Sequence, residues 1–137
     1  MRCAVRLRDD GPVREVQTIG ACFAAALAAK DRDALAGMLD AQIDFRGLTP
    51  NRVWEASDRE QVLETLLGSW FEPSDQITAL TKLETDAVAD RERVGYRLAV
   101  SNDEGDFVVE QQAYLSATDG RIEWMRVVCS GFRPGAG

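Results

Sequence analysis

The chain has 137 residues, of which 45% are hydrophobic, 28% are charged and 7% are aromatic, and these values predict one compact domain. It has 16 basic and 23 acidic residues, and the resulting formal charge of -7 repels phosphate polymers and anionic membranes. We therefore expect neither nucleic acid nor a membrane surface as a partner.

The residue types restrict the possible chemistry. Histidine is absent, so any proton transfer would need a carboxylate, Tyr, Cys or Lys. Cys3, Cys22 and Cys129 have no Cys-x-x-Cys spacing, which suggests neither a disulfide framework nor a thiolate metal site. We expect no metal and no other cofactor. No apolar run is long enough for a signal peptide or a membrane span, so we expect a cytoplasmic protein.

Three helices are expected in the first half of the chain. Residues 13–29 carry apolar side chains at three-and-four spacing, the pattern of a helix with one buried face. A short second helix follows Asp31, a favourable N-cap. The third helix opens at Ser57, because Ser57 and Glu60 have the spacing at which two side chains cap each other's backbone donors, and it ends before Pro73.

Strands make up the rest of the pattern. Residues 42–48 alternate, with Ile43 and Phe45 on one face and Asp44 and Arg46 on the other. Four further strands, three of them joined by hairpins, are predicted in the second half of the chain. The turns that separate them lie at residues 89–91, 102–105 and 119–120. This order predicts an α+β fold in which one curved sheet wraps the helices.

Several short segments, taken in this order, resemble the nuclear transport factor 2-like superfamily, and within it the SnoaL-like and ketosteroid-isomerase-like bacterial proteins. They are the run Leu-Asp-Ala-Gln-Ile-Asp-Phe-Arg at residues 39–46, the turn Asp-Gly-Arg-Ile at 119–122 and Trp-Met-Arg at 124–126. The resemblance implies a conical α+β barrel, with a cavity between a mainly antiparallel sheet and about three helices. We place one domain at residues 13–133, with tails at 1–12 and 134–137.

The turns also predict which strand residues share a face. If Thr118 pairs with Arg121, Tyr114 lies opposite Met125, and a symmetric preceding loop puts Arg97 opposite Glu110. The first face is then expected to carry Glu84, Arg97, Glu110, Gln112, Tyr114, Met125, Val127 and Cys129. The second face is expected to carry Leu83, Val94, Tyr96, Leu98, Val109, Gln111, Ala113, Leu115, Ile122, Trp124, Arg126 and Val128.

Neither of these faces has the composition of a solvated surface. The helices can cover only one of them, so we expect a second copy of the chain on the other, as a homodimer through the sheet. The resemblance to ketosteroid isomerases implies that Met125 points into the cavity. The first face would then line the cavity, and the second face would form the dimer surface.

The first face is interpreted as a site for a small apolar metabolite. Glu110 would accept or donate a proton, Tyr114 would donate a hydrogen bond, Gln112 would orient the ligand, and Arg97 would hold an anionic group or tune the pKa of Glu110. The alternative, of equal weight, is a structural ladder of cross-strand charges that includes Glu84.

Further ligand contacts are assigned to aromatic and polar residues near this face. Met125 and Cys129 would line the cavity, although Cys129 is expected to be an inert thiol. Trp54 lies in a predicted loop and is a better ligand contact than Trp70, which belongs to the stripe of the third helix. Arg46 would reach the mouth of the pocket or, as an edge-strand position favours, lie in solvent.

One departure from the family limits the catalytic hypothesis. Ketosteroid isomerases, which are a known example of pKa tuning, use an aspartate base at the end of the first strand, where this chain has Gly47. Two hypotheses follow. The chain is a cofactor-free isomerase, cyclase or hydratase acting on an apolar metabolite, or it is a non-catalytic ligand-binding or dimerisation module of the same fold.

Overall fold

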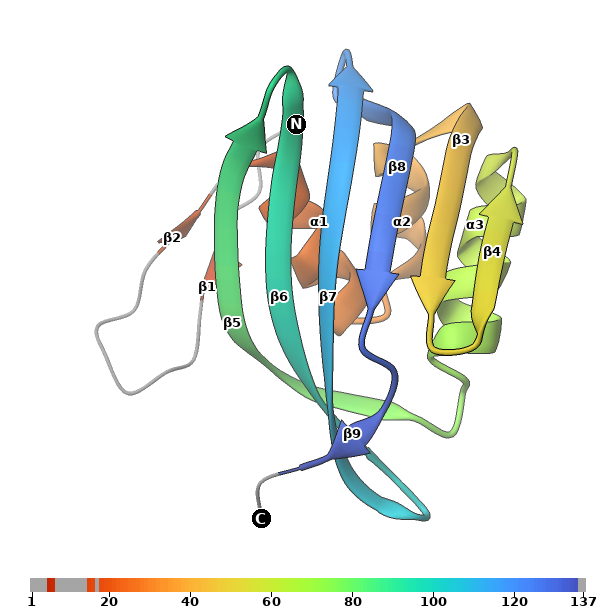
Figure 1. Cartoon of the computed structure of the whole chain (residues 1–137), viewed down its shortest axis with the longest axis vertical. Helices are drawn as coiled ribbons and strands as arrows, with labels where there is room; N and C mark the ends of the chain where they lie inside the picture. Colours follow the sequence, from red (N-terminus) through yellow and green to blue (C-terminus); the bar gives the residue numbers. More distant parts are fainter. Residues whose placement is uncertain (1–4, 7–14, 17, 136–137) are drawn as a thin grey trace.

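A curved sheet covers one side of three helices (Figure 1). The structure is a computed structural model that describes residues 5–6, 15–16 and 18–135. The helices are α1 (Ile19–Ala28), α2 (Arg32–Met38) and α3 (Arg59–Glu64), and α3 continues into a π-helical segment, η1 (Thr65–Trp70). The predicted α+β class and the three helices are confirmed.

Six strands follow the order β4-β3-β8-β7-β6-β5, and the short strand β9 adds to β7. The strand pairs are antiparallel except that β3 runs parallel to β8. A separate small sheet joins β1 (Val5–Arg6) to β2 (Glu15–Val16). The strands of the main sheet are β3 (Leu39–Thr49), β4 (Arg52–Ala56), β5 (Gln76–Val88), β6 (Arg91–Asn102), β7 (Gly105–Thr118), β8 (Arg121–Cys129) and β9 (Arg133–Pro134).

The first helix begins later than the apolar spacing predicts. Thr18 is its N-cap, and the Thr18 hydroxyl accepts a hydrogen bond from the backbone N–H of Ala21. Glu15 and Val16, placed in the helix by the prediction, belong to β2. The predicted start of this helix, at residue 13, lies outside the described residues. Asp31 caps α2 as expected, with its carboxylate accepting from Ala34 N–H.

The third helix begins one residue later than predicted. Asp58 is the N-cap, and its carboxylate accepts from Gln61 N–H at 2.8 Å. The side chain of Gln61 accepts in return from Ser57 N–H at 2.9 Å. The reciprocal cap of the prediction therefore exists, but it joins Gln61 to Ser57 and Asp58, not Ser57 to Glu60.

Strand β4 was not predicted, because Arg52–Ala56 is short and follows a proline turn that reads as a loop. The turn holds Asn51 at a φ of 76°, which lets the chain reverse at once and pair with β3. Trp54, predicted in a loop, therefore belongs to an edge strand.

The predicted register is correct between β6 and β7 but wrong between β7 and β8. Arg97 lies opposite Glu110, as expected. After Thr118 has paired with Arg121, a bulge shifts the β7–β8 pairing by one residue, so Tyr114 lies opposite Arg126 and not Met125. A shift of one residue moves every later side chain of a strand to the other face of the sheet.

The inner face of the sheet, which we define as the face toward the helices, is apolar. Phe23 of α1 packs against Tyr96 of β6, with ring centroids 6.5 Å apart. On β8 the bulge turns Met125 inward and Trp124 away from the helices. The buried residues of this face are Leu39, Ile43, Phe45, Gly47, Leu80, Leu83, Val94, Tyr96, Leu98, Val100, Val109, Gln111, Ala113, Leu115, Ile122, Met125, Val127 and Cys129.

Candidate functional site

The four residues proposed as the centre of the site share one face, but it is the outer face of the sheet. Arg97, Glu110, Gln112 and Tyr114 alternate with buried residues that point toward the helices. The side chains of Arg97 and Glu110 are 40% and 52% exposed. The predicted placement of these residues inside the barrel is therefore wrong, and the cause is the assignment of the face. Their catalytic roles stay a prediction.

On the outer face, Arg97 and Glu110 form one of several ion pairs between strands. Arg97 contacts the Glu110 carboxylate at 2.8 Å, and both Nε and Nη2 of Arg93 donate to the Asp86 carboxylate. The Arg93 hydrogen bonds hold the pKa of Asp86 below its ordinary value. The other cross-strand pairs are Arg46–Glu55 and Arg126–Asp44, and Lys82 pairs with Glu84 within β5. The Arg97–Glu110 pair agrees with the structural alternative, whereas Glu84, which that alternative places in the cross-strand ladder, lies opposite Gly95 and pairs with Lys82 of its own strand.

Met125 and Cys129 point inward, as the resemblance implies, and both are buried. Cys129 ends a chain of buried polar groups: the Tyr96 hydroxyl donates to Gln111 Oε1 at 2.5 Å, and Gln111 Nε2 donates to Cys129 Sγ at 3.3 Å. Burial raises the pKa of Tyr96 well above its ordinary value, so this phenol is neutral near pH 7.

Our prediction missed the role of Tyr96 and Gln111 because it assigned both residues to the dimer surface. A glutamine within an otherwise apolar face was a usable signal, since a buried amide needs hydrogen-bond partners. The cysteines also differ from the expectation. Cys129 is a free buried thiol, as predicted, whereas Cys22 in α1 is disulfide-bonded.

The two candidate tryptophans lie together on the inner side. Trp54 and Trp70 meet edge to face with centroids 6.2 Å apart, and Trp54 Nε1 donates to the Thr49 hydroxyl at 2.8 Å. Trp70 is only 7% exposed and is packed into the core, as expected for the helix stripe. Its indole lies against Gly47, where a Cβ atom would be 2.5 Å from the ring. The indole thus fills the space that a side chain at position 47 would need.

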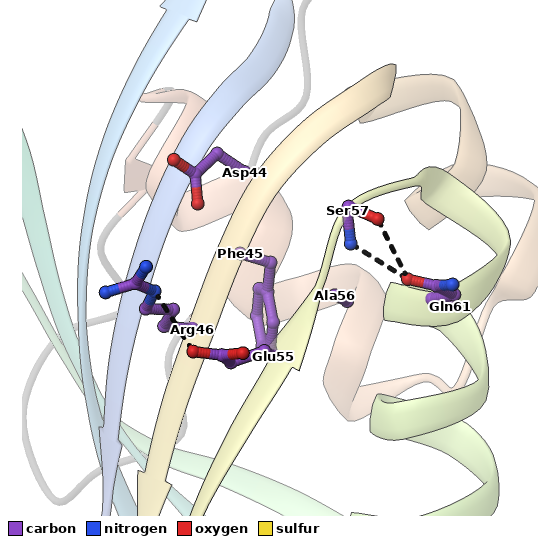
Figure 2. A pocket seen from close by; sticks show the side chains of 7 residues that line it. All are labelled: Asp44, Phe45, Arg46, Glu55, Ala56, Ser57 and Gln61. Atoms are coloured by element: carbon purple, nitrogen blue, oxygen red, sulfur yellow. Dashed lines mark hydrogen bonds and ion pairs between the residues drawn. The ribbon is translucent and has the colours of Figure 1, made fainter.

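Arg46 lines a groove at the edge of the sheet, between β3, β4 and the start of α3 (Figure 2). The groove has a volume of about 360 Å³ and opens to solvent. Phe45 and Ala56 form its buried floor, and polar side chains form its rim. Arg46 lies opposite Glu55 of β4, with the ion pair at 3.6 Å, and its side chain is more than half exposed, as the solvent-exposed alternative predicts. The edge-strand reason for that alternative is wrong, because β3 lies between β4 and β8.

A second groove, of about 490 Å³, contains a carboxyl group that the prediction overlooked. Glu92 of β6 accepts a hydrogen bond from Gly20 N–H, at the first turn of α1, at 2.5 Å. Burial raises the pKa of Glu92, while hydrogen bonds from Gly20 and from the Thr18 side chain oppose this rise. The hydrogen bond from Gly20 links α1 to the sheet. Because burial has the largest effect, the pKa of Glu92 is higher than that of a solvated carboxylate.

Two further findings concern metals and membranes. Within the residues that the structure describes, no three His, Cys, Asp or Glu side chains are grouped to hold a metal ion. In the same part of the chain, no helix combines the length and the apolar character needed to cross a membrane.

Comparison with solved structures gives matches over most of the chain. A proposed isomerase from Rhodopseudomonas palustris matches with a TM-score of 0.68 and 17% identity, over 83% of this chain and 90% of that one. A protein of ketosteroid isomerase-like fold from Catenulispora acidiphila, solved with trimethylamine, matches at 0.63 and 15%, over 82% and 85%.

An LEH-like epoxide hydrolase from M. tuberculosis matches with a TM-score of 0.62 and 13% identity, over 82% of this chain and 80% of that one. No family profile matches the chain, and no curated protein matches its sequence. At these identities the likeness is one of fold, and it agrees with the order of elements predicted from the sequence.

Proposed function

We propose that this chain, which has the nuclear transport factor 2-like fold, binds a small uncharged molecule between its sheet and its helices. One observation carries the proposal: the buried residues of the inner face are neutral, and the Tyr96–Gln111–Cys129 chain is set among them. An apolar wall stabilises an uncharged ligand, whereas a charged one would lose its hydration without gaining a counter-ion.

The same observation favours binding over acid-base catalysis. The fully buried residues of the inner face include no carboxylate among those described, and Glu92, which faces α1 from β6, is only partly buried and already accepts a hydrogen bond from Gly20 N–H. Trp70 fills the space beside Gly47 where an aspartate base would project. The structural neighbours named for isomerisation and epoxide hydrolysis support a small organic molecule as the ligand class. Chemistry at Glu110, Tyr114 and Arg97 would have to take place on the outer face.

The test compares three ligands of similar shape by thermal denaturation: cyclohexanone, methylenecyclohexane and the anion cyclohexanecarboxylate. A ligand that binds only the folded state raises the midpoint in proportion to the logarithm of its concentration. We expect both neutral compounds to raise the midpoint and to be recovered unchanged by gas chromatography, and the anion to have no effect. Stabilisation by the anion alone, or chemical conversion of the bound compound, would contradict the proposal.

We further propose that two copies of the chain associate through the outer face. Leu48, Val53 and Val128 lie side by side there, on β3, β4 and β8, and are 49%, 61% and 50% exposed. The ion pairs around them balance positive and negative charge, so two identical faces can meet without the repulsion that a chain of charge -7 otherwise produces. We call these three residues the outer apolar patch.

A further inference from the structure

Cys22 forms a disulfide whose partner can be identified by elimination. Cys22 lies in α1, is buried and is disulfide-bonded. The chain has three cysteines, Cys3, Cys22 and Cys129, and Cys129 is a free thiol. A disulfide within the chain therefore leaves Cys3 as the partner, although Cys3 itself lies outside the described residues.

The first strand lies close enough to α1 for this pairing. β1 begins at Val5, two residues after Cys3, and contacts α1. It also pairs with β2, which ends two residues before Thr18, the N-cap of α1. Two residues of extended chain span about 7 Å at most, and the Cα atoms of a disulfide usually lie about 4 to 7 Å apart. A bond from Cys3 to α1 is therefore compatible with the observed position of β1.

Few interactions of their own hold β1 and β2 in place. Among the described residues the two strands form two pairs, Val5–Val16 and Arg6–Glu15, and they are separate from the main sheet. An isolated two-stranded hairpin is marginally stable at best in water. A disulfide stabilises such an element by removing conformational freedom from the unfolded chain. A bond between Cys3 and α1 would therefore hold a strand pair whose own backbone hydrogen bonds are too few to do so.

We propose that a disulfide between Cys3 and Cys22 fastens the strand pair β1–β2 to α1 and that a dithiol reductant releases it. A thiolate of the reductant attacks one sulfur of the bond and forms a mixed disulfide, and its second thiol then displaces the protein sulfur. Two electrons pass to the protein, the reductant becomes a disulfide, and Cys3 and Cys22 become thiols by taking up the two protons that the dithiol loses. The fastened form is expected in an oxidising compartment and the released form in a reducing one.

The first experiment identifies the bond in the full-length, air-oxidised chain. In denaturant we expect one reactive thiol, that of Cys129, and three after treatment with dithiothreitol. Trypsin digestion without reductant is expected to give peptides 3–6 and 15–30 as one cross-linked species, detected by mass spectrometry. Three thiols before reduction would overturn the proposal. A bond from Cys22 to Cys129, or to a second copy of the chain, would overturn it as well.

The second experiment tests whether the bond holds the strand pair. Hydrogen exchange at the amides of β1 and β2 is compared with and without dithiothreitol, and we expect it to be about tenfold faster or more once the bond is reduced. Cys3→Ser should show the fast exchange without reductant, and the control Cys129→Ser should retain the slow exchange. Unchanged exchange at β1 and β2 after complete reduction would contradict the proposal. If Cys3→Ser fails to fold, the comparison of reduced and oxidised wild type decides.

Discussion

The indole ring of Trp70 leaves no room for a side chain at position 47, where the chain has Gly47. The two indole carbons nearest to a Cβ atom there belong to a rigid ring and lie 2.5 Å away, closer than atoms can pack. We expect Gly47→Ala to lower the free energy of unfolding by about 1 to 3 kcal/mol, the usual cost of forcing extra volume into a packed core. Urea denaturation measures this change.

Two variants separate this steric effect from the general cost of replacing a glycine. A Cβ atom added to Gly37 in α2 would meet no atom within 4 Å, so Gly37→Ala should be neutral or stabilising through the higher helix propensity of alanine. Trp70→Leu should relieve the clash, so that Gly47→Ala costs less in that background. An equal cost in both backgrounds would show that the indole is not the obstacle.

The raised pKa of Glu92 predicts that the free energy of unfolding depends on pH, in a direction that follows from the burial of this side chain. Because burial raises the pKa of Glu92 above its ordinary value of 4.5, the protonated form favours folding. That contribution is present in full below the unfolded pKa and is lost as the pH rises through the folded pKa. Glu92→Gln mimics the protonated form, so we expect this variant to gain stability relative to the wild type as the pH rises from below 4.5, the ordinary pKa, through the raised pKa of the folded state.

The measurement is the difference in unfolding free energy between the two proteins across that range, which removes the contributions of all other carboxyl groups. Gly20 N–H and the Thr18 side chain face Glu92 from α1, and Asp86, Asp90 and Arg91 line the same groove. A difference that stays constant, or that favours the wild type increasingly as the pH rises, would mean that the hydrogen bonds outweigh burial.

At the scale of elements, the start of α3 distinguishes the observed cap from the one that the sequence suggests. Asp58 accepts from Gln61 N–H at 2.8 Å, whereas the Ser57 hydroxyl lies 3.4 Å from the Gln61 side chain. We expect Asp58→Ala to cost about 1 kcal/mol, as for loss of an N-cap, and Ser57→Ala to cost less than about 0.5 kcal/mol. Thermal and urea denaturation of both variants measure these losses of unfolding free energy. A larger loss for Ser57→Ala than for Asp58→Ala would support the cap by Ser57 that the sequence predicts.

A comparison of the predicted and observed elements shows which features of the fold the sequence pattern can predict. Periodicity located the three helices and the five long strands because each buries one face, but it missed the short strand β4. The loop at 102–105 fixed the β6–β7 pairing. The bulge at Glu123, between the Ala117–Ile122 and Ser116–Trp124 pairs, leaves no clear signal, because Ile122, Glu123 and Trp124 alternate just as well in either register. That single inserted residue separated Met125, which faces inward as expected, from Glu110 and Tyr114, which do not.

The candidate site was less predictable than the fold for a related reason. A polar residue on a strand signals either an exposed face or a satisfied buried group, and the sequence pattern is the same for both. Gln111 and Gln112 are neighbours of the same type, yet Gln111 bonds to Tyr96 in the core and Gln112 lies exposed. Only the positions of the partner groups, which depend on long-range packing, separate the two cases.

For the whole molecule, the properties of the outer face bear on whether the chain is a monomer or a dimer. The outer apolar patch is bordered by Arg46–Glu55 and Arg126–Asp44 ion pairs, so a second copy could bury the apolar side chains while the charges remain paired at the rim. We expect sedimentation equilibrium to show a dimer for the wild type.

Val128→Glu should convert this dimer to a monomer, because it places a charge at the centre of the patch in both copies, where the two charges repel. The side chain is half exposed within one chain, so the folded monomer should lose little stability. Val88→Glu is the matched control, since Val88 is 52% exposed but lies at the turn end of the β5–β6 hairpin, away from the patch. A monomeric wild type, or equal dissociation by both variants, would exclude the outer face as the interface.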